Sequence, residues 1–211
     1  MYATTPAIIL SSAPYREWGR SFFLLTAQKG LIHAHAIGVA RMRSKLGPKL
    51  TPYHLLSLTL VSRFTDRIIG VDVIETFSNL WRDARRQGYA AWGLAAIQGS
   101  LKPGLADVRI FDLCLEYLRT LNTLSVFDKT FPSLRLAFVV KLLHFLGYRL
   151  KEGENAPLRS GVIPFLGDGS LREVAGAMSP VQKIVHERSE EMVREIMGER
   201  MVPLARYLTA L

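Results

Sequence analysis

The sequence contains a single cysteine, Cys114, and no long uninterrupted apolar run. One thiol cannot form an intramolecular disulfide and gives no CxxC pair for structural zinc, which fits a reducing cytoplasm. Cys114 lies in an apolar helical pattern, so we expect a small core residue. The most apolar stretches, 89–101 and 134–148, are short or interrupted by Lys141 and His144, which excludes a membrane span. The first ten residues lack a basic region and a long apolar core, so no signal peptide is expected.

Sequence motifs for catalysis are missing as well. There is no GxSxG, and no pair of carboxylates is placed for a shared active site. Gly167-Asp168-Gly169-Ser170 is too short for a phosphate loop and lacks its lysine, so a turn is expected. His33 and His35 share one face of a predicted strand, but no acidic or thiol ligand lies near them in sequence. We therefore expect a protein that is not an enzyme and that holds no metal ion or cofactor.

Acidic residues are scarce in the first part of the chain. The 211 residues carry a formal charge of +9, of which residues 1–86 contribute +7 and residues 87–211 contribute +2. A local excess of this kind is expected where a protein meets a polyanion. An anionic membrane surface would also attract it, so the charge alone does not identify the partner.

The basic excess is concentrated in the segment from Gly38 to Pro52. Arg41, Arg43 and Lys45 recur at every second position, Lys49 follows, and no acidic residue interrupts. If this run continues a strand, its period of two points the three cations to one side of the sheet. Cations gathered in this way repel each other unless an anion lies across them, and a phosphate backbone meets that need. The alternative is a solvated loop whose charges serve solubility.

Apolar and β-branched runs, separated by glycine and proline, predict five short strands in the first 77 residues. These runs are 6–12, 21–27, 31–39, 55–61 and 68–74. Five strands in so short a length suit a small closed barrel, of which the OB-fold is the common example. Phe22 and Phe23 point to opposite faces of their strand, so at most one of them is available to a ligand.

The hydrophobic period changes to that of helices from Asn79 onward. Helices are expected up to the break at 102–104, then after a possible cap at Asp107, then over 131–146 with an end at Gly147. Residues 151–170 read as a loop, and further helices are expected from Ser179 and over 201–211. The predicted fold is therefore α+β, with a five-stranded OB-fold barrel (1–78) followed by an all-helical C-terminal domain (79–211) that carries a loop-rich insert at about 149–178.

Cations and aromatic residues occur together in the barrel, as in proteins that bind nucleic acid. The aromatic residues are Tyr15, Trp18, Phe22, Phe23, Tyr53 and Phe64. The predicted DNA-binding cations are Arg16, Arg20, Lys29, Arg41, Arg43, Lys45 and Lys49, with Arg82, Arg85 and Arg86 extending the basic surface from the first helix. The three helical arginines would equally form an ordinary polar helix face.

The chain resembles the RecO recombination mediator proteins of bacteria in several segments. These are Ala7-Ile8-Ile9-Leu10-Ser11-Ser12-x-Pro14-Tyr15-x-Glu17, Leu25-Thr26-x-x-Lys29-Gly30, Gly38-Val39-Ala40-Arg41-x-Arg43-Ser44-Lys45-Leu46, Leu50-Thr51-Pro52-Tyr53, and 138–143 with Phe145-Leu146-Gly147-Tyr148. The resemblance implies an OB-fold on a helical domain, without enzymatic turnover. It also implies binding to single- and double-stranded DNA, annealing of complementary strands, and a cytoplasmic, nucleoid-associated location.

The resemblance further implies two protein partners, RecR and the C-terminal tail of single-strand-binding protein, and recombinase loading with their help. An acidic tail with a hydrophobic end needs a cation beside an apolar groove, for which Arg135 and Lys141 are the candidates. The alternative is that these two residues are ordinary helix charges. Many members carry a four-cysteine zinc module, but residues 149–178 contain no cysteine, so no zinc is expected. The other reading is an adaptor whose basic barrel binds an acidic protein tail and meets DNA incidentally.

Overall fold

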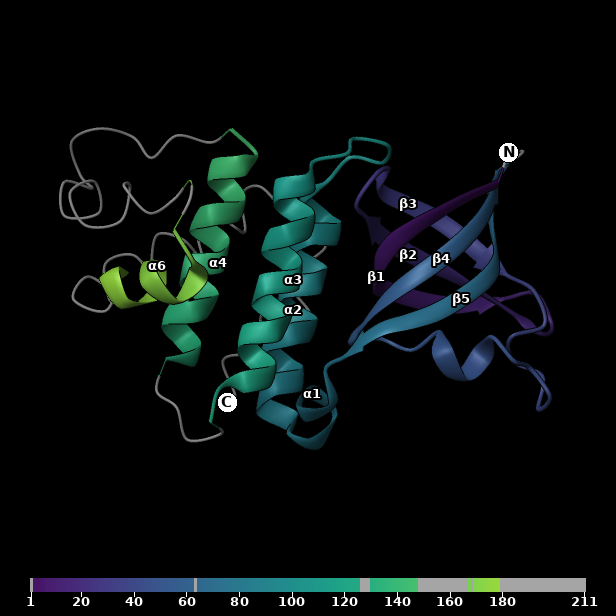
Figure 1. Cartoon of the computed structure of the whole chain (residues 1–211), viewed down its shortest axis with the longest axis horizontal. Helices are drawn as coiled ribbons and strands as arrows, with labels where there is room; N and C mark the ends of the chain where they lie inside the picture. Colours follow the sequence, from purple (N-terminus) through teal and green to yellow (C-terminus); the bar gives the residue numbers. More distant parts are fainter. Residues whose placement is uncertain (1, 63, 126–129, 148–166, 168, 179–211) are drawn as a thin grey trace.

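A computed structural model of the chain describes residues 2–62, 64–125, 130–147, 167 and 169–178 (Figure 1). The strands are β1 (Tyr2–Tyr15), β2 (Gly19–Thr26), β3 (Gly30–Ala36), β4 (His54–Ser62) and β5 (Asp66–Thr76). The helices are the 3-10 turn η1 (Gly47–Lys49) and α1 (Ser78–Arg82), α2 (Ala84–Ser100), α3 (Val108–Thr123), α4 (Phe131–Phe145) and α6 (Leu171–Met178). The barrel occupies one end of the molecule, with the helices beside it (Figure 1).

The five strands close into a barrel in the order β1-β2-β3-β5-β4. All neighbouring strands are antiparallel except β3 and β5, which pair in parallel over two positions, Ala34 with Asp66 and His35 with Arg67. The five predicted strands are confirmed, with two differences in their bounds: β1 extends well beyond the predicted 6–12, and β3 ends at Ala36, before the predicted 39. The predicted α+β class with an N-terminal OB-fold is confirmed as well.

The basic segment that follows β3 is not a continuation of that strand. From Ile37 to Tyr53 the chain forms turns and the single turn η1. Gly38 has φ +74°, which lies outside the extended region and therefore ends the strand. Glycine suits this position because residues with a side chain rarely adopt such a φ value. The condition under which a period of two would align Arg41, Arg43 and Lys45 on one face of a sheet is therefore not met, and the segment is a loop.

Strand β1 supplies two hydrophobic cores because its side chains alternate between the faces of the sheet. Ala7 and Ile9 point into the barrel, where they join one buried cluster. Ile8 and Leu10 point outward and join the cluster formed by the helices. The helical part also bonds to β3, since the backbone N–H of Gly104, between α2 and α3, donates to the carbonyl of Leu31 at 3.0 Å. The helices are therefore packed directly on the barrel wall.

The helical expectations are largely confirmed, with two differences. Asp107 accepts a hydrogen bond from the N–H of Arg109 and begins α3, and Gly147 follows α4 with φ +87°. The first predicted helix is divided into α1 and α2, since Asp83 is extended and its carboxylate caps α2 by accepting from the N–H of Arg86. Helix α6 lies within the segment predicted to be loop-rich. The predicted helices from Ser179 onward lie outside the described residues.

Strands end at Thr76 and helices begin at Ser78, while the two-domain division at residue 78 stays a prediction. Cys114 is buried in α3, as expected of a small core residue. Among the helices that the structure describes, none has both the length and the apolar character that crossing a membrane requires.

The contact between α2 and α3 depends on a glycine. A Cβ added to Gly93 would lie 2.5 Å from the ring of Tyr117, which is fully buried and donates its hydroxyl to the carbonyl of Tyr89 at 3.1 Å. We predict that Gly93→Ala lowers the free energy of unfolding by about 1–3 kcal/mol, because overpacking moves a ring that has no free space. Urea unfolding measures the change.

The matched control is Gly176→Ala in α6, where an added Cβ would meet no atom within 4 Å. Since alanine favours helix over glycine, that variant should keep or slightly raise stability. Equal losses in the two variants would contradict the packing argument.

Candidate nucleic-acid interface

The basic loop, residues 38–52, is held to the barrel by apolar side chains at both of its ends. Val39 and Leu50 are buried in the barrel core. Between them, Arg41, Arg43 and Lys45 are exposed. Within the described part of the chain, the side chains of these three residues have no ion pair and no hydrogen bond. The loop therefore presents three positive charges to solvent on a fixed base.

Local hydrogen bonds give the loop its shape. The hydroxyl of Ser44 accepts from the N–H of Gly47 at 3.0 Å, and the carbonyl of Leu46 accepts from the N–H groups of Lys49 and Leu50 at 3.1 Å. A Cβ on residue 47 would lie 2.3 Å from the carbonyl oxygen of Val39, so only glycine fits there. The loop is thus a folded unit and not a flexible tether.

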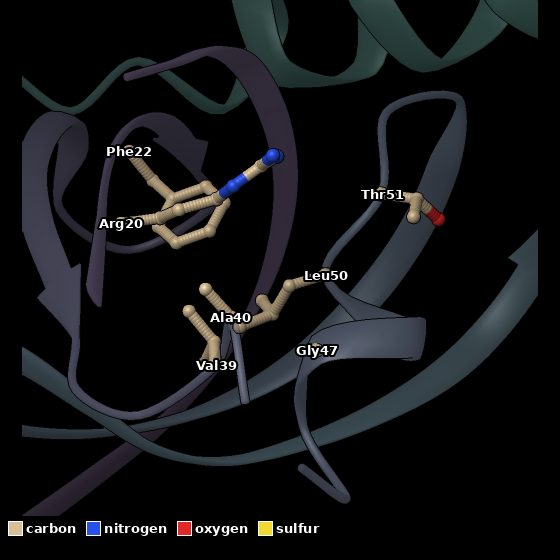
Figure 2. Close-up of a pocket in the computed structure, with 7 residues that line it drawn as sticks. All are labelled: Arg20, Phe22, Val39, Ala40, Gly47, Leu50 and Thr51. Carbon is tan, nitrogen blue, oxygen red and sulfur yellow. The ribbon is translucent and has the colours of Figure 1, made fainter. Parts of the chain in front are cut away.

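A hollow of about 300 Å³ lies between the basic loop and β2. Figure 2 shows Arg20 and Phe22 of β2 on one side and Val39, Ala40 and Leu50 on the other, with Gly47 and Thr51 completing the lining. Phe22 is buried, whereas Arg20 is exposed at the mouth. Arg20 is therefore the predicted cation that lies next to the basic loop.

The β1–β2 turn adjoins the same loop. The N–H of Ala40 donates to the carbonyl of Trp18 at 3.2 Å. In this turn Arg16 is exposed and has φ +53°, and its guanidinium lies over the ring of Tyr15, 5.2 Å from the centroid. Arg16 and Arg20 thus extend the charge of the basic loop around one end of the barrel.

Two other predicted cations are already paired with carboxylates. The ammonium of Lys49 lies 2.8 Å from the carboxylate of Asp72 and also donates to the carbonyl of Val71. The ammonium of Lys29 donates to the hydroxyl of Ser62 at 3.1 Å and lies 3.7 Å from the carboxylate of Asp66. Both should attract a phosphate less strongly than the three cations of the basic loop, because a neighbouring carboxylate offsets part of their charge.

The three arginines predicted on the first helix have different surroundings. Arg82 is exposed at the end of α1. The guanidinium of Arg85 lies 4.7 Å from the centre of the Phe131 ring. Arg86 is only 7% exposed, and its guanidinium donates to the carbonyls of Asn122 and Leu124. Arg86 therefore holds the end of α3 and is not available to a ligand, which corrects its assignment to the DNA-binding surface.

The predicted tail-binding pair does not form an exposed cationic site. Lys141 is 5% exposed, and its ammonium donates to the carbonyl of Gly169. Arg135 is half-buried, with its guanidinium over the ring of Trp92 at 5.3 Å. The burial of Lys141 corrects its assignment as a surface contact for an acidic tail.

The outer face of the barrel brings together residues that the sequence analysis treated separately. Rings of Tyr15 and His35 lie 4.9 Å apart, and those of Phe23 and His33 lie 4.7 Å apart. Arg67, opposite His35 in the sheet, was not predicted, because a parallel pairing across 32 residues leaves no local signal. Burial, Arg67, Arg16 and His33 together lower the pKa of His35. In the described ranges, no three potential metal ligands gather.

The thiol and the predicted aromatic residues differ in their exposure to solvent. Cys114 is the only thiol, and its burial raises its pKa, so it stays protonated and unreactive at neutral pH. Of the predicted aromatic residues, Trp18, Phe23 and Phe64 are exposed, whereas Phe22 and Tyr53 are buried. Since Trp18 lies in the β1–β2 turn that is bonded to Ala40, the end of the barrel with the basic loop combines exposed cations with an exposed ring.

Comparison with known proteins gives consistent matches. The family described as "Recombination protein O N terminal" matches residues 1–77, the barrel. The DNA repair protein RecO of Geobacter metallireducens is 31% identical over 147 residues, covering 69% of this chain and 59% of the relative. That of Geobacter sulfurreducens is 30% identical, with 68% and 58% covered. That of Symbiobacterium thermophilum is 24% identical, with 96% and 88% covered. The chain thus spans less than two thirds of the length of the two Geobacter relatives.

The position of Arg86 leads to a stability prediction. Arg86→Ala should lower the free energy of unfolding by about 2–4 kcal/mol, because the carbonyls of Asn122 and Leu124 lose a charged donor in a buried site. Urea unfolding followed by circular dichroism measures it. Arg82→Ala, which removes an exposed charge nearby, should change stability by less than about 0.5 kcal/mol. Similar stability of the two variants would show that the buried guanidinium does not hold α3.

Proposed function

The chain belongs to the RecO family, and from that premise we propose that it is a DNA-binding mediator of recombinational DNA repair. In this proposal the barrel binds single- and double-stranded DNA through phosphate contacts. The observation that carries it is the basic loop, where Arg41, Arg43 and Lys45 are exposed without a carboxylate partner in the described part of the chain. Three like charges on a fixed base lower their mutual repulsion when a polyanion lies across them.

The proposed site residues differ in their exposure to solvent and in whether a carboxylate lies beside them. Arg16, Arg20, Arg41, Arg43 and Lys45 form its centre. Lys29 and Lys49 contribute less because carboxylates already lie beside them. Arg82 and Arg85 are a secondary extension on the helical side, and Arg86 is not included.

The proposed activity is annealing of complementary strands, without chemical turnover. A basic surface that neutralises two strands lets them approach, provided that their bases stay free to pair. We further propose that the protein assists recombinase loading together with RecR, and that it contacts the acidic tail of single-strand-binding protein. Since Lys141 is buried, Arg135 beside Trp92 is the remaining predicted contact for that tail.

A second candidate function is that of an adaptor whose basic loop binds an acidic protein tail. The observation in its favour is that apolar side chains accompany the cations, because Met42 is fully exposed and Ile37 is 48% exposed. Cations beside exposed apolar groups suit an acidic segment with a hydrophobic end. An adaptor would bind such a peptide tightly and DNA only weakly.

Salt dependence distinguishes these functions. For the parent protein, the logarithm of DNA affinity should fall steeply and linearly with the logarithm of salt concentration. Replacement of Arg41, Arg43 and Lys45 by alanine should weaken binding about 10- to 100-fold at low salt. It should flatten the slope by about 2–3, since each of the three lost phosphate contacts removes about 0.7–0.9. Fluorescence anisotropy with labelled single and double strands measures both quantities.

The matched control removes three charges from the helical part, as Lys102→Ala, Arg109→Ala and Arg119→Ala. Arg109 and Arg119 are paired with Asp107 and Glu75, so their loss lowers net charge without touching the basic loop. If both triple variants weaken binding alike, net charge and not the basic loop explains the affinity.

Annealing tests the mediator activity itself. Two complementary labelled oligonucleotides, one coated with single-strand-binding protein, should anneal faster in the presence of the parent protein. The acceleration should fade with salt and disappear in the basic-loop triple variant, because it requires neutralised phosphates. Strand pairing is followed by energy transfer between the labels. Tight peptide binding without any acceleration would favour the adaptor.

A further inference from the structure

The outer face of β1, β2 and β3 carries a group of rings that we call the aromatic platform, formed by Tyr15, Phe23, His33 and His35. The pairing register creates it: Phe23 lies opposite His33, and Ser21 lies opposite His35. Since alternate residues share a face, all of these side chains point away from the barrel core. Phe22, which lies between Ser21 and Phe23 in the sequence, is buried inside the barrel.

The helices cover only part of this outer face. Ile8, Leu10, Leu25 and Leu31 occupy the covered part and belong to the core cluster shared with the helices. Toward the other end of the same strands the face is open, and Phe23 remains 37% exposed. The aromatic platform is thus the part of this outer face that the described helices leave uncovered.

Small side chains leave the rings accessible. On β1, the residues opposite Phe23 and Ser21 are Ser11 and Ala13. Because these two side chains are small, flat rings can lie over this part of the sheet without obstruction. The Tyr15–His35 and Phe23–His33 ring planes are inclined by 34° and 33°. The two ring pairs therefore form a shallow, mixed aromatic surface.

The charged groups at the edge of the platform are mainly cations. Arg16, in the β1–β2 turn, lies over Tyr15, and Arg67 of β5 lies opposite His35. Two carboxylates are near in sequence: Glu17 is exposed in the turn, and Asp66 lies beside Lys29 and Ser62. Rings bordered by guanidinium groups match the two components of a single strand, its bases and its phosphates.

We propose that the aromatic platform binds the bases of single-stranded DNA, which stack on Tyr15, Phe23, His33 and His35 while Arg16 and Arg67 hold the phosphates. Duplex DNA, whose bases are stacked internally, would be bound by the basic loop alone. This inference rests on the proposed function and divides it between two adjoining surfaces. The hydrogen bond from Ala40 to Trp18 joins the basic loop to the turn that carries Arg16, so one strand can reach both surfaces.

The division has a consequence for annealing. A strand held by its bases on the platform cannot pair there, whereas a strand held by its phosphates on the basic loop can. Transfer of a strand from the platform to the basic loop would therefore expose bases for pairing. The platform would serve to capture single strands and the basic loop to present them.

The test compares three probes of equal length: an oligothymidine, an abasic single strand, and a duplex. The variant Tyr15→Leu with Phe23→Leu keeps apolar volume on the sheet but removes two ring faces. We expect about tenfold or more loss of affinity for the oligothymidine, and unchanged affinity for the abasic strand and the duplex. The parent protein should prefer the oligothymidine to the abasic strand, and the variant should not.

The matched control is Tyr2→Leu with Phe64→Leu. It removes the same two ring types from exposed positions of the same barrel that lie outside the platform. This control should bind all three probes like the parent. Circular dichroism and thermal unfolding of both double variants check that the barrel is intact.

The outcomes of this comparison separate base binding by the aromatic platform from the proposed function as a whole. If the parent binds the abasic strand as tightly as the oligothymidine, or if the platform variant keeps the preference, the platform does not bind bases. Duplex binding that still depends on the basic loop would then leave the proposed function in place. No binding of any probe by the parent would instead contradict the proposed function. Equal losses for all three probes would also contradict base binding, because they would show that the two rings support the barrel and do not select bases.

A second measurement uses His35. Burial, Arg67, Arg16 and His33 lower the pKa of His35 in the free protein, whereas a nearby phosphate favours the charged imidazolium, so the pKa of His35 should be higher in the complex. Affinity for the oligothymidine should therefore rise as pH falls through the range in which His35 is protonated in the complex but still neutral in the free protein. His35→Gln should remove most of this rise while leaving duplex binding unchanged. A pH profile like that of the parent would exclude His35 from the site.

Discussion

The alternation of side chains along β1 is the constraint on which the rest of the structure depends. Ala7 and Ile9 fill the barrel, while Ile8 and Leu10 form the surface on which the helices pack. One extended strand can do this because successive side chains point to opposite faces. A shift of one residue in its register would exchange the two sets and disrupt both cores. The alternation is interrupted once, by a register shift between Ile9 and Ser11, after which Ser11 and Ala13 lie opposite Phe23 and Ser21 on the outer face. That part of the outer face, toward Tyr15, is open where the helices end.

The distribution of charge follows from which cations find partners within the fold. Lys49 lies beside Asp72, and Arg86 donates to carbonyls at the end of α3, so both are used in holding the structure together. Arg41 and Arg43 are exposed on turns between the buried Val39 and Leu50, and neither forms an ion pair in the described part of the chain. A net charge of +9 is therefore less informative than the few cations that remain unpaired.

Local pattern predicted much of the fold because it reports burial. The five strands, the cap at Asp107 and the helix end at Gly147 were all recognisable from hydrophobic period and turn residues. The break at Asp83 was missed because apolar spacing continues across it, and α6 because short helices give a weak periodic signal. In the candidate site, Arg86 was misplaced since a sequence does not tell whether a guanidinium faces solvent or carbonyls.

The sequence by itself determined the class of fold, the basic N-terminal part and the resemblance to one family, because composition, periodicity and motifs are local properties of the chain. The tertiary structure alone decided which charges stay free and which rings meet. The pairing of His35 with Arg67 joins residues 32 positions apart through a parallel contact that closes the barrel. The hydrogen bond between Trp18 and Ala40 lies just beyond the paired Arg20 and Ala36, where β2 and β3 meet the turn and the basic loop. Contacts of this kind arise only when strands distant in sequence become neighbours.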